Sequence, residues 1–326
     1  MAMLRSCVKA LAVFCLVLQL PERGGAQTFP AKTVRYVVPD SAGSGGDVFG
    51  RIIAAGLSDV FGQQVIVDNR AGAASNLGAE IVARAVPDGY MLLAVSSTLS
   101  ANVSLYRSLP YDLVRDLAPV TQMGFTPFVL VVHPSMPLKT VDDLIRLAKA
   151  KPGAINYSSA GTGTATFIAG ELFKGVVGVN IVHVPYKGGG PALLAVMSGE
   201  AQVYFAPLIT ALSHIRQGTV RALATISAQR FPLFPALPTL AEAGVQGVEF
   251  SNSFGLMVPG KTPAETIAVL NRATIAVLGK PDVVRRINEL GCVVVGSTPG
   301  EYAAYVKKEI ATLAELFRKI GVTADQ

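Results

Sequence analysis

Two turns rich in glycine and hydroxyl residues are the part of this sequence best suited to binding chemistry. The first, SAGSGGD at 41–47, follows an apolar β-branched run, and the second, SAGTGT at 159–164, follows another. Glycine lets backbone N–H groups approach a ligand closely, and the N-terminus of a following helix favours negative charge. Because neither turn contains Lys, Arg or His, both predict a small anion, such as a carboxylate, as the ligand.

Such turns also occur as ordinary connections in which glycine relieves backbone strain and Asp47 or Thr164 caps a helix. The pairing of two similar turns favours a binding site, because open parallel sheets bind ligands at the carboxyl ends of their strands. Ser159, Thr162 and Thr164 add hydroxyl donors to the second turn. Two such turns facing each other would form a cleft, and Thr98 is a further cleft candidate because it follows a third predicted strand.

Ser44 also permits an enzymatic interpretation. AGSGG, with Ser44 between a predicted strand and a predicted helix, loosely matches the nucleophile elbow of a serine hydrolase. That chemistry needs a base and an acid. The candidate bases lie where structural roles are common for histidine; they are His133, His183 and His214. The sequence therefore predicts no catalytic residue, and a secreted serine hydrolase that uses Ser44 is kept as the alternative.

No cluster of His, Cys and Asp has the spacing of a metal site. We therefore expect neither a metal ion nor another cofactor. The basic residues are not gathered into one patch, and the RR at 285 and KK at 307 lie on helical patterns. Such a distribution predicts solvated helix faces and no nucleic-acid partner.

Alternating strands and helices position these turns. Short β-branched runs predict strands at 34–38, 64–68, 91–95, 128–132, 155–158, 180–184, 202–205, 221–226 and 254–258, with a further candidate at 292–295. Helical periodicity predicts helices at 47–61, 74–85, 141–150, 165–175, 190–198, 240–243, 263–278, 282–290 and 299–320. Strands separated by single helices are typical of α/β proteins with mainly parallel, covered sheets.

Two proline-rich crossings, near 127–140 and 232–260, suggest that the chain leaves one lobe, builds a second and returns. We expect a discontinuous first lobe of residues 27–130 plus 251–326 and a second lobe of residues 131–250. A third interpretation makes the predicted helix 299–320 a docking surface for a partner protein. Its apolar residues more often pack on their own lobe; they are Tyr302, Tyr305, Ile310, Leu313, Leu316 and Phe317.

The N-terminus predicts a secretory signal peptide of residues 1–26. Arg5 and Lys9 precede an apolar run that ends at Leu20, and small residues precede a cleavage site after Ala26. Cleavage would lower the formal net charge from +6 to +4 and would leave Cys292 as the one cysteine. The exported chain would then have no internal disulfide and would depend on a buried core for its stability.

Seven segments, in order, resemble the Bug (TctC-type) extracytoplasmic solute-binding receptors of tripartite tricarboxylate transporters. They extend over nearly all of residues 30–320 and read VVPDSAGSGGDVFGR, GQQVIVDNRAGAASNLGAEIVARAVPDGYMLL, SLPYDLVRDLAPV, LAKAKPGAINYSSAGTGTATFIAGELF, VHVPYKGGGPAL, RALATISAQRFPLFPALPTLAEAG and GLMVPGKTPAETIAVLN. The resemblance implies a periplasmic-binding-protein fold of type II character. Each of its two lobes is a mixed, mainly parallel sheet flanked by helices, and the ligand lies in the cleft between them.

In this family the two turns grip a ligand carboxylate. Carried over, that role falls on Ala42, Gly43, Ser44, Gly45 and Asp47, and on Ser159, Ala160, Gly161, Thr162 and Thr164. The resemblance further implies a periplasmic, monomeric receptor for a small organic, acidic or aromatic acid. Its partners would be the membrane permease subunits of a tripartite tricarboxylate transporter or a sensor.

The sequence departs from the family pattern at four positions near the expected cleft: Asp40, Phe167, Ala206 and Ser253. Asp40 stands where the family usually has Phe, so an extra carboxylate borders the first turn. It would repel a second ligand carboxylate unless it faces away or pairs with an ammonium group. Ala206 replaces a frequent Asp after the strand near 205 and is kept with Asp40 among the candidate ligand-binding residues.

Overall fold

The computed structural model describes residues 29–321, and the chain divides into two units, Met1–Ala31 and Lys32–Gln326. The predicted signal peptide, residues 1–26, lies outside the described residues. Of the first unit only Phe29–Ala31 is described, and its Phe29–Pro30 peptide bond is cis. Within the described range, no helix has both the length and the apolar character needed to cross a membrane. The helices and strands of residues 29–321 all belong to the second unit.

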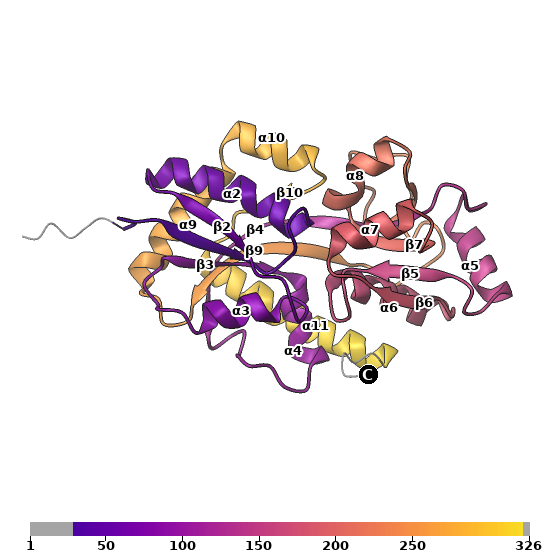
Figure 1. Ribbon diagram of the computed structural model, residues 1–326, viewed down its shortest axis with the longest axis horizontal. Helices are drawn as coiled ribbons and strands as arrows, with labels where there is room; N and C mark the ends of the chain where they lie inside the picture. Colours follow the sequence, from indigo (N-terminus) through magenta and orange to yellow (C-terminus); the bar gives the residue numbers. More distant parts are fainter. Residues whose placement is uncertain (1–28, 322–326) are drawn as a thin grey trace, which may run out of the picture. The chain divides into compact units, whose positions relative to one another are not determined.

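One ten-stranded sheet runs through this unit in the order β2-β1-β3-β9-β4-β7-β5-β6, and β8 and β10 both pair with β4. The strands are β1 (Val34–Val38), β2 (Val65–Asn69), β3 (Met91–Ser96), β4 (Leu117–Val132), β5 (Asn156–Ser159), β6 (Val182–Pro185), β7 (Val203–Pro207), β8 (Arg221–Ile226), β9 (Ser251–Pro259) and β10 (Val293–Val294). Figure 1 shows β4 and β9 running between the other strands.

The strands pair in parallel toward both ends of the sheet and antiparallel in its middle. β1 pairs in parallel with β2 and β3, and β5 pairs in parallel with β6 and β7. β9 is antiparallel to both β3 and β4, and the end of β4 is antiparallel to β7 and β8. We call β2, β1, β3, β9 and residues 117–127 of β4 the first strand group. Residues 128–132 of β4 and β5–β8 form the second strand group.

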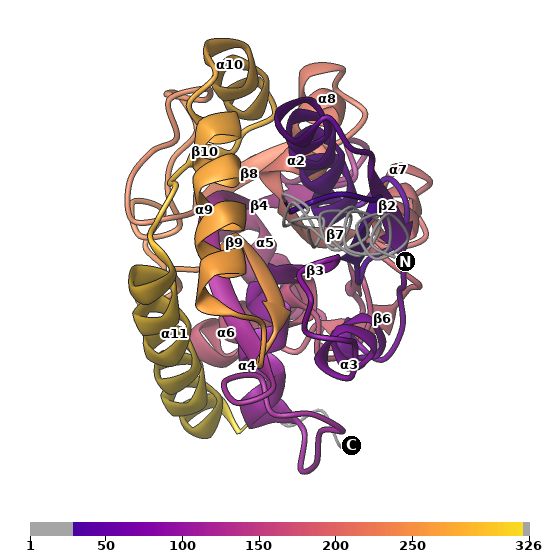
Figure 2. The same ribbon diagram turned by 90° about the vertical axis from the view of Figure 1, so that its left-hand side faces the viewer.

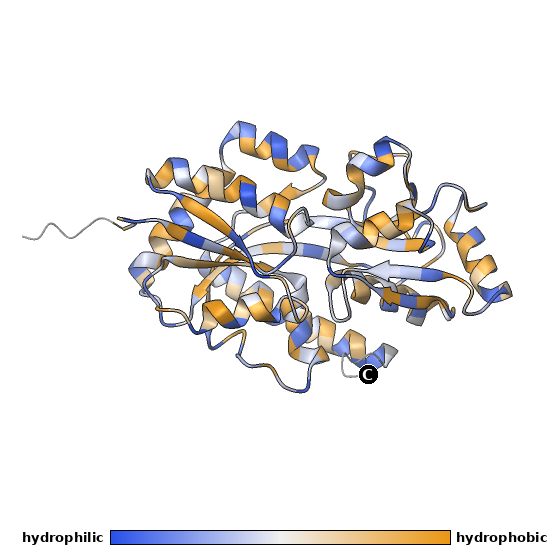
Figure 3. Ribbon diagram, viewed as in Figure 1, coloured by the Kyte–Doolittle hydropathy of each residue, from blue (hydrophilic) through white to orange (hydrophobic). Residues whose placement is uncertain are grey.

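The helices cover both faces of the sheet. They are α2 (Gly45–Phe61), α3 (Asn76–Ala83), α4 (Ser97–Leu105), α5 (Val141–Ala150), α6 (Ala165–Val177), α7 (Gly189–Met197), α8 (Leu208–Arg216), α9 (Ala264–Leu278), α10 (Pro281–Glu289) and α11 (Pro299–Ile320). In Figure 1, α2 and α10 lie on one side of the first strand group, and α3, α4 and α11 lie on the other. Figure 3 shows hydrophobic and hydrophilic residues sharing single helices such as α5 and α10, as expected for helices with one buried face.

Most predicted elements are confirmed, and the ranges of α5, α11 and β8 agree in full. The predicted helix 240–243 is wrong, because that stretch forms turns after Thr239 pairs with Thr225. The sequence does not predict α4, whose residues, STLSANVSL, are mostly weak helix formers. It also does not predict residues 117–127 of β4, where prolines interrupt the β-branched pattern.

Successive residues at the end of β4 pack into two different core clusters, because successive strand side chains point to opposite faces of the sheet. Phe128, Leu130 and Val132 pack with α5 and α6, whereas Val129 and Val131 pack with α7 and α8. Helix α11 contributes side chains to two core clusters. Its Tyr302 and Val306 join the cluster below the first strand group, and its Leu313 and Phe317 join that below the second. Figure 2 shows α11 as one continuous rod beside the sheet.

Candidate functional site

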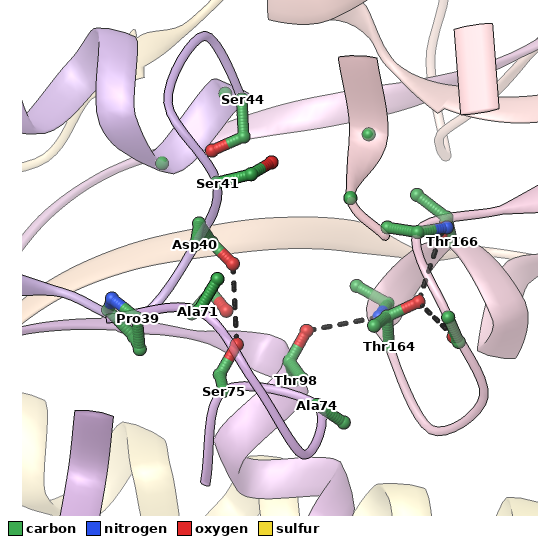
Figure 4. A pocket seen from close by; sticks show the side chains of 18 of the residues that line it. Pro39, Asp40, Ser41, Ser44, Ala71, Ala74, Ser75, Thr98, Thr164 and Thr166 are labelled. Carbon is green, nitrogen blue, oxygen red and sulfur yellow. Dashed lines mark hydrogen bonds between the residues drawn. The ribbon is translucent and has the colours of Figure 1, made fainter. Parts of the chain in front are cut away.

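A cavity of about 560 Å³ lies between the loops that follow the strands of the two groups. From the first strand group it is lined by Pro39, Asp40, Ser41, Ser44, Gly45, Gly46, residues 71–75, Ser96, Thr98, Tyr106 and Asn252. From the second it is lined by residues 160–162, 164–166, 186–189, Tyr204, Pro207 and Thr210. Figure 4 shows side chains of both groups directed into the same space.

The starts of six helices border this cavity. Each of α2, α3, α4, α6, α7 and α8 contributes its N-cap residue or a residue of its first turn to the lining. A helix N-terminus carries partial positive charge from its aligned peptide dipoles and from N–H groups that the helix does not use. The cavity is therefore suited to a negatively charged group, although few charged side chains line it.

Side chains of the first turn fix its conformation through hydrogen bonds to its own backbone. Ser44 caps α2 by accepting a hydrogen bond from the N–H of Asp47, and Asp47 Oδ2 accepts one from the N–H of Gly43 at 2.9 Å. Gly43 has φ of +79°, which favours glycine. These bonds leave the N–H groups of Gly45 and Gly46, the first residues of α2, outside the helical hydrogen-bond ladder.

Asp47 serves the turn itself, since its carboxylate is buried and does not line the cavity. It also accepts hydrogen bonds from Arg51 and from Asn69 Nδ2, the latter at 2.9 Å. Although burial opposes ionisation, the bonds from Arg51, Gly43 and Asn69 hold the pKa of Asp47 below its ordinary value. Asp47 is therefore a structural anion that fixes the start of α2.

Hydroxyl groups hold the second turn. Ser159 Oγ lies 2.6 Å from His183 Nε2 and accepts a hydrogen bond from the N–H of Gly161 at 3.0 Å. Thr164 Oγ1 donates to the carbonyl of Gly161 at 2.6 Å, and Thr166 Oγ1 accepts from the N–H of Ala160 at 2.8 Å. Burial lowers the pKa of His183 to about 4, so this histidine is neutral at physiological pH.

A third small-residue loop, AGAAS at 71–75, completes the cavity wall. Ala73, Ala74 and Ser75 all have positive φ, a conformation that costs free energy in residues with a side chain. The loop is tied down because Asn102 Nδ2 donates to the carbonyl of Ala74 at 2.7 Å. Such local strain is typical of binding sites, where the surrounding structure enforces one loop conformation.

Asp40 points into the cavity and accepts a hydrogen bond from Ser75 Oγ at 3.3 Å (Figure 4). Its other side contacts Gly46, where an added Cβ would collide with Asp40 Oδ2. Burial, together with the nearby negative charge of Asp47, raises the pKa of Asp40 to about 6, against the lowering effect of the Ser75 hydrogen bond. Asp40 is thus an anion held among anion-favouring helix starts.

Three buried polar atoms of cavity-lining residues have no hydrogen-bond partner of normal distance and angle among the described residues. They are Ser41 Oγ, Tyr204 Oη and Asn252 Oδ1. The Thr166 hydroxyl is close enough to Tyr204 to oppose slightly the rise in its pKa, which burial dominates. Buried polar groups usually have partners. These three atoms are instead buried in the cavity wall without such a partner among the described residues.

The loops of the two strand groups touch around the cavity. The N–H of Ala165, the first residue of α6, donates to Thr98 Oγ1 at 3.0 Å. Gly45 approaches α8 so closely that an added Cβ would lie 2.6 Å from Ile209 Cγ2. Gly188 likewise faces Ser41, and Gly163 faces the Tyr106 hydroxyl. A ligand in this cavity would contact both strand groups at once.

Eight of the thirteen residues predicted for the site line the cavity: Asp40, Ser44, Gly45, Thr98, Ala160, Gly161, Thr162 and Thr164. Ala42 and Gly43 are exposed, while the side chains of Asp47 and Ser159 accept hydrogen bonds from backbone N–H groups within their turns. Ala206 is buried within β7, between β4 and its own core cluster. These five residues do not line the cavity.

Sequence reasoning missed the loop at 71–75 and the residues Asn252, Tyr204, Thr166 and Thr210. The loop carried a usable signal, because its small residues lie between a strand and a helix as in the other two turns. Tyr204 carried none because it is one member of an apolar strand run, and Asn252 carried none because it lies between two serines outside the predicted strand 254–258. Lys187 also lines the cavity.

Ser44 is not in the setting of a hydrolase nucleophile. Its hydroxyl caps α2, and the three histidines make their side-chain bonds to other residues, namely Ser135, Ser159 and Thr219. Across residues 29–321, no three or more His, Cys, Asp and Glu side chains gather closely enough to hold a metal ion.

A protein-family model for the tripartite tricarboxylate transporter family receptor, TctC, matches residues 49–322. The chain belongs to this receptor family. The family comprises extracytoplasmic receptors. Among curated relatives, BugT of Bordetella pertussis is 35% identical over 313 residues, which cover 95% of this chain and 96% of BugT.

Solved structures of related proteins have the same fold. Rpa4515 of R. palustris, determined with adipate, is 34% identical with a TM-score of 0.88 and covers 90% of this chain and 99% of its own. MatC from Rhodopseudomonas palustris, determined with bound malate, is 30% identical with a TM-score of 0.85 and covers 88% of this chain and 99% of its own. The expected fold class is thus confirmed, and this chain is a solute-binding receptor of the TctC type.

Proposed function

We propose that this receptor captures a small carboxylate in the cavity between the two strand groups. The observation that carries the proposal is the convergence of six helix starts on one space with a single lysine and no arginine in its described lining. Dipoles and free N–H groups stabilise a carboxylate without a buried counter-ion. The adipate and malate seen with Rpa4515 and MatC support this ligand class.

Capture would proceed by closure of two lobes, residues 27–130 plus 251–326 and residues 131–250. A ligand that contacts both lobes gains its full set of contacts only when they are closed, so binding favours the closed state. The contacts between Thr98 and Ala165 and between Gly45 and α8 join residues of the two proposed lobes beside the cavity. The protein acts by binding and release and does not convert its ligand chemically.

Cleavage after Ala26 would release the receptor into the periplasm as a monomer. There it would deliver its ligand to the permease subunits of a tripartite tricarboxylate transporter or report occupancy to a sensor. Both roles need a receptor that changes conformation with its ligand, because the partner distinguishes the occupied from the empty state.

The test is a thermal-shift screen of mono-, di- and tricarboxylates, aromatic acids and amino acids on the purified protein lacking residues 1–26. A ligand at about 100 times its Kd should stabilise the protein by about 2.7 kcal/mol. Isothermal titration then gives the affinity.

Thr162→Trp is the blocking variant, because Thr162 is exposed and lines the cavity. It should abolish the thermal shift. Thr312→Trp places the same side chain on the exposed surface of α11 and should leave the shift unchanged. Equal shifts in both variants would place the ligand elsewhere and refute the proposed site.

A further inference from the structure

Asp40 is the one acidic residue in the described lining of the cavity, and Lys187 is the one basic residue. An acid at this place runs against the rest of the site, because helix starts and free N–H groups attract an anion from the ligand. Two anions in one small, partly desolvated space repel each other strongly. The ligand must therefore offer something to Asp40 that offsets this repulsion.

The surroundings of Asp40 do not supply a positive charge. Its side-chain hydrogen bond comes from the neutral Ser75 hydroxyl, and the charged side chain that affects it most is Asp47, which is also negative. The nearest arginine along α2, Arg51, bonds to Asp47 and Asn69. Apart from its contacts with Ser75 and Gly46, the carboxylate faces the cavity (Figure 4).

We propose that Asp40 selects a ligand that carries both a carboxylate and a protonated amine, that is, an amino acid or an amino carboxylate. The ammonium group binds Asp40, and the ligand carboxylate binds the helix starts around the rest of the cavity. Asp40 thereby acts as a specificity-determining residue against dicarboxylates. This inference rests on the proposed function and narrows its ligand class.

The other groups at the cavity fit such a ligand. An ammonium group has three donors and no acceptor, and Asn252 Oδ1 and Tyr204 Oη are oxygens without an ordinary hydrogen bond at the same cavity. Lys187 provides a positive side chain on the second strand group, where it would favour the carboxylate end of the ligand. The cavity thus offers acceptors and donors for both ends of a zwitterion.

The experiment compares ligands matched in length. Isothermal titration at pH 7.5 measures succinate against 4-aminobutanoate, glutarate against 5-aminopentanoate, adipate against 6-aminohexanoate, and the standard α-amino acids against the carboxylic acids that lack their amino group. We expect the tightest ligand to carry an amine and to bind at least tenfold more tightly than its matched acid.

Asp40→Asn keeps the size of the side chain and its acceptor for Ser75 but removes the charge. It should weaken binding of the amine ligand at least tenfold and strengthen binding of the matched dicarboxylate. The control is Asp59→Asn, an exposed acid near the far end of α2 that pairs with Lys280 at 3.8 Å. It should leave both affinities unchanged.

The pH dependence of ligand affinity in the wild-type protein is a second test, which needs no variant. Protonation of Asp40 near pH 6 should weaken binding of the amine ligand between pH 7.5 and pH 5, and should strengthen binding of a simple monocarboxylate because the repulsion from Asp40 is removed. The other ionisable groups that face Asp40 are Asp47 from α2 and Tyr204 from β7, with Lys187 across the cavity. Neither Asp47 nor Tyr204 should titrate in that interval, since the pKa of Asp47 is lowered and burial raises the pKa of Tyr204.

The proposal is overturned if a dicarboxylate is the tightest ligand and Asp40→Asn leaves its affinity within twofold. In that case the proposed capture of a carboxylate is retained and the proposed role of Asp40 is rejected. If no carboxylate of any kind binds, the proposed capture of a carboxylate is rejected as well. Amine binding that is independent of pH would also count against Asp40.

Discussion

Asp40 shows how one buried acid can oppose stability and serve recognition. Burial raises its pKa from 3.8 to about 6, so the folded protein disfavours the charged form that predominates at neutral pH. The Ser75 hydrogen bond offsets only part of this cost. Strained or costly groups are often retained where function needs them.

We predict that Asp40→Asn stabilises the ligand-free protein at pH 7.5 by about 1–3 kcal/mol, the order expected for a shift of this size at a side chain partly open to the cavity. A raised pKa in the folded state contributes stability that is present below the unfolded value, near 3.8, and is lost as pH rises through about 6. The gain from the variant should therefore vanish near pH 4. Urea unfolding at both pH values measures it, and an equal gain at both would show that the buried charge of Asp40 is not its cause.

At the scale of elements, the cavity depends on how closely helix starts approach one another. Gly45 is the first residue of α2 and is not among the glycines with positive φ. Its own backbone conformation therefore does not require glycine. What requires it is α8 on the other strand group, whose Ile209 Cγ2 would lie 2.6 Å from an added Cβ. Glycine at this position keeps the two helices in contact.

We predict that Gly45→Ala weakens ligand binding about tenfold or more, because overpacking of this kind costs about 1–3 kcal/mol. Helix propensity alone would predict the opposite direction, since Ala favours a helix by about 1 kcal/mol over Gly. Gly300→Ala in the first turn of α11 is the control, because no atom lies within 4 Å of its added Cβ. Unchanged affinity in Gly45→Ala, measured by titration, would show that α2 and α8 need not approach this closely for binding.

At the scale of the whole unit, two elements join the strand groups. β4 belongs to both groups, and α11 anchors Tyr302 in one core cluster and Leu313 in another. Residues Lys32–Gln326 accordingly form one compact unit. The division into two lobes remains a prediction about motion, and the shared elements are where bending would have to occur.

We predict that this unit unfolds in urea as a single cooperative transition. Leu313→Ala should lower its free energy of unfolding by about 2–5 kcal/mol, the usual cost of removing a buried leucine, because Leu313 is only 3% exposed. Lys308→Ala, on the exposed face of α11, should change it by less than about 0.5 kcal/mol. Two separate transitions in the wild-type protein would contradict the claim that α11 and β4 couple the two strand groups.

The sequence by itself determined most elements and both glycine turns, because a strand, a helix or a turn is encoded by periodicity and residue type over a few neighbouring positions. The order of seven motifs also led to the receptor family, which the family model and the relatives confirm. It did not predict α4, whose serine-rich residues become helical through burial between α3, α11 and the sheet.

Only the tertiary structure decided which turn residues face the cavity. Ser44 and Asp47 are three positions apart in one turn, yet Ser44 lines the cavity and Asp47 does not. The direction of Asp40, and the meeting of Asn252 with Tyr204 and the 71–75 loop, depend on strand register and on contacts between distant segments. Local sequence patterns carry no record of such contacts, because the partners lie far apart along the chain and are brought together only when both strand groups have packed.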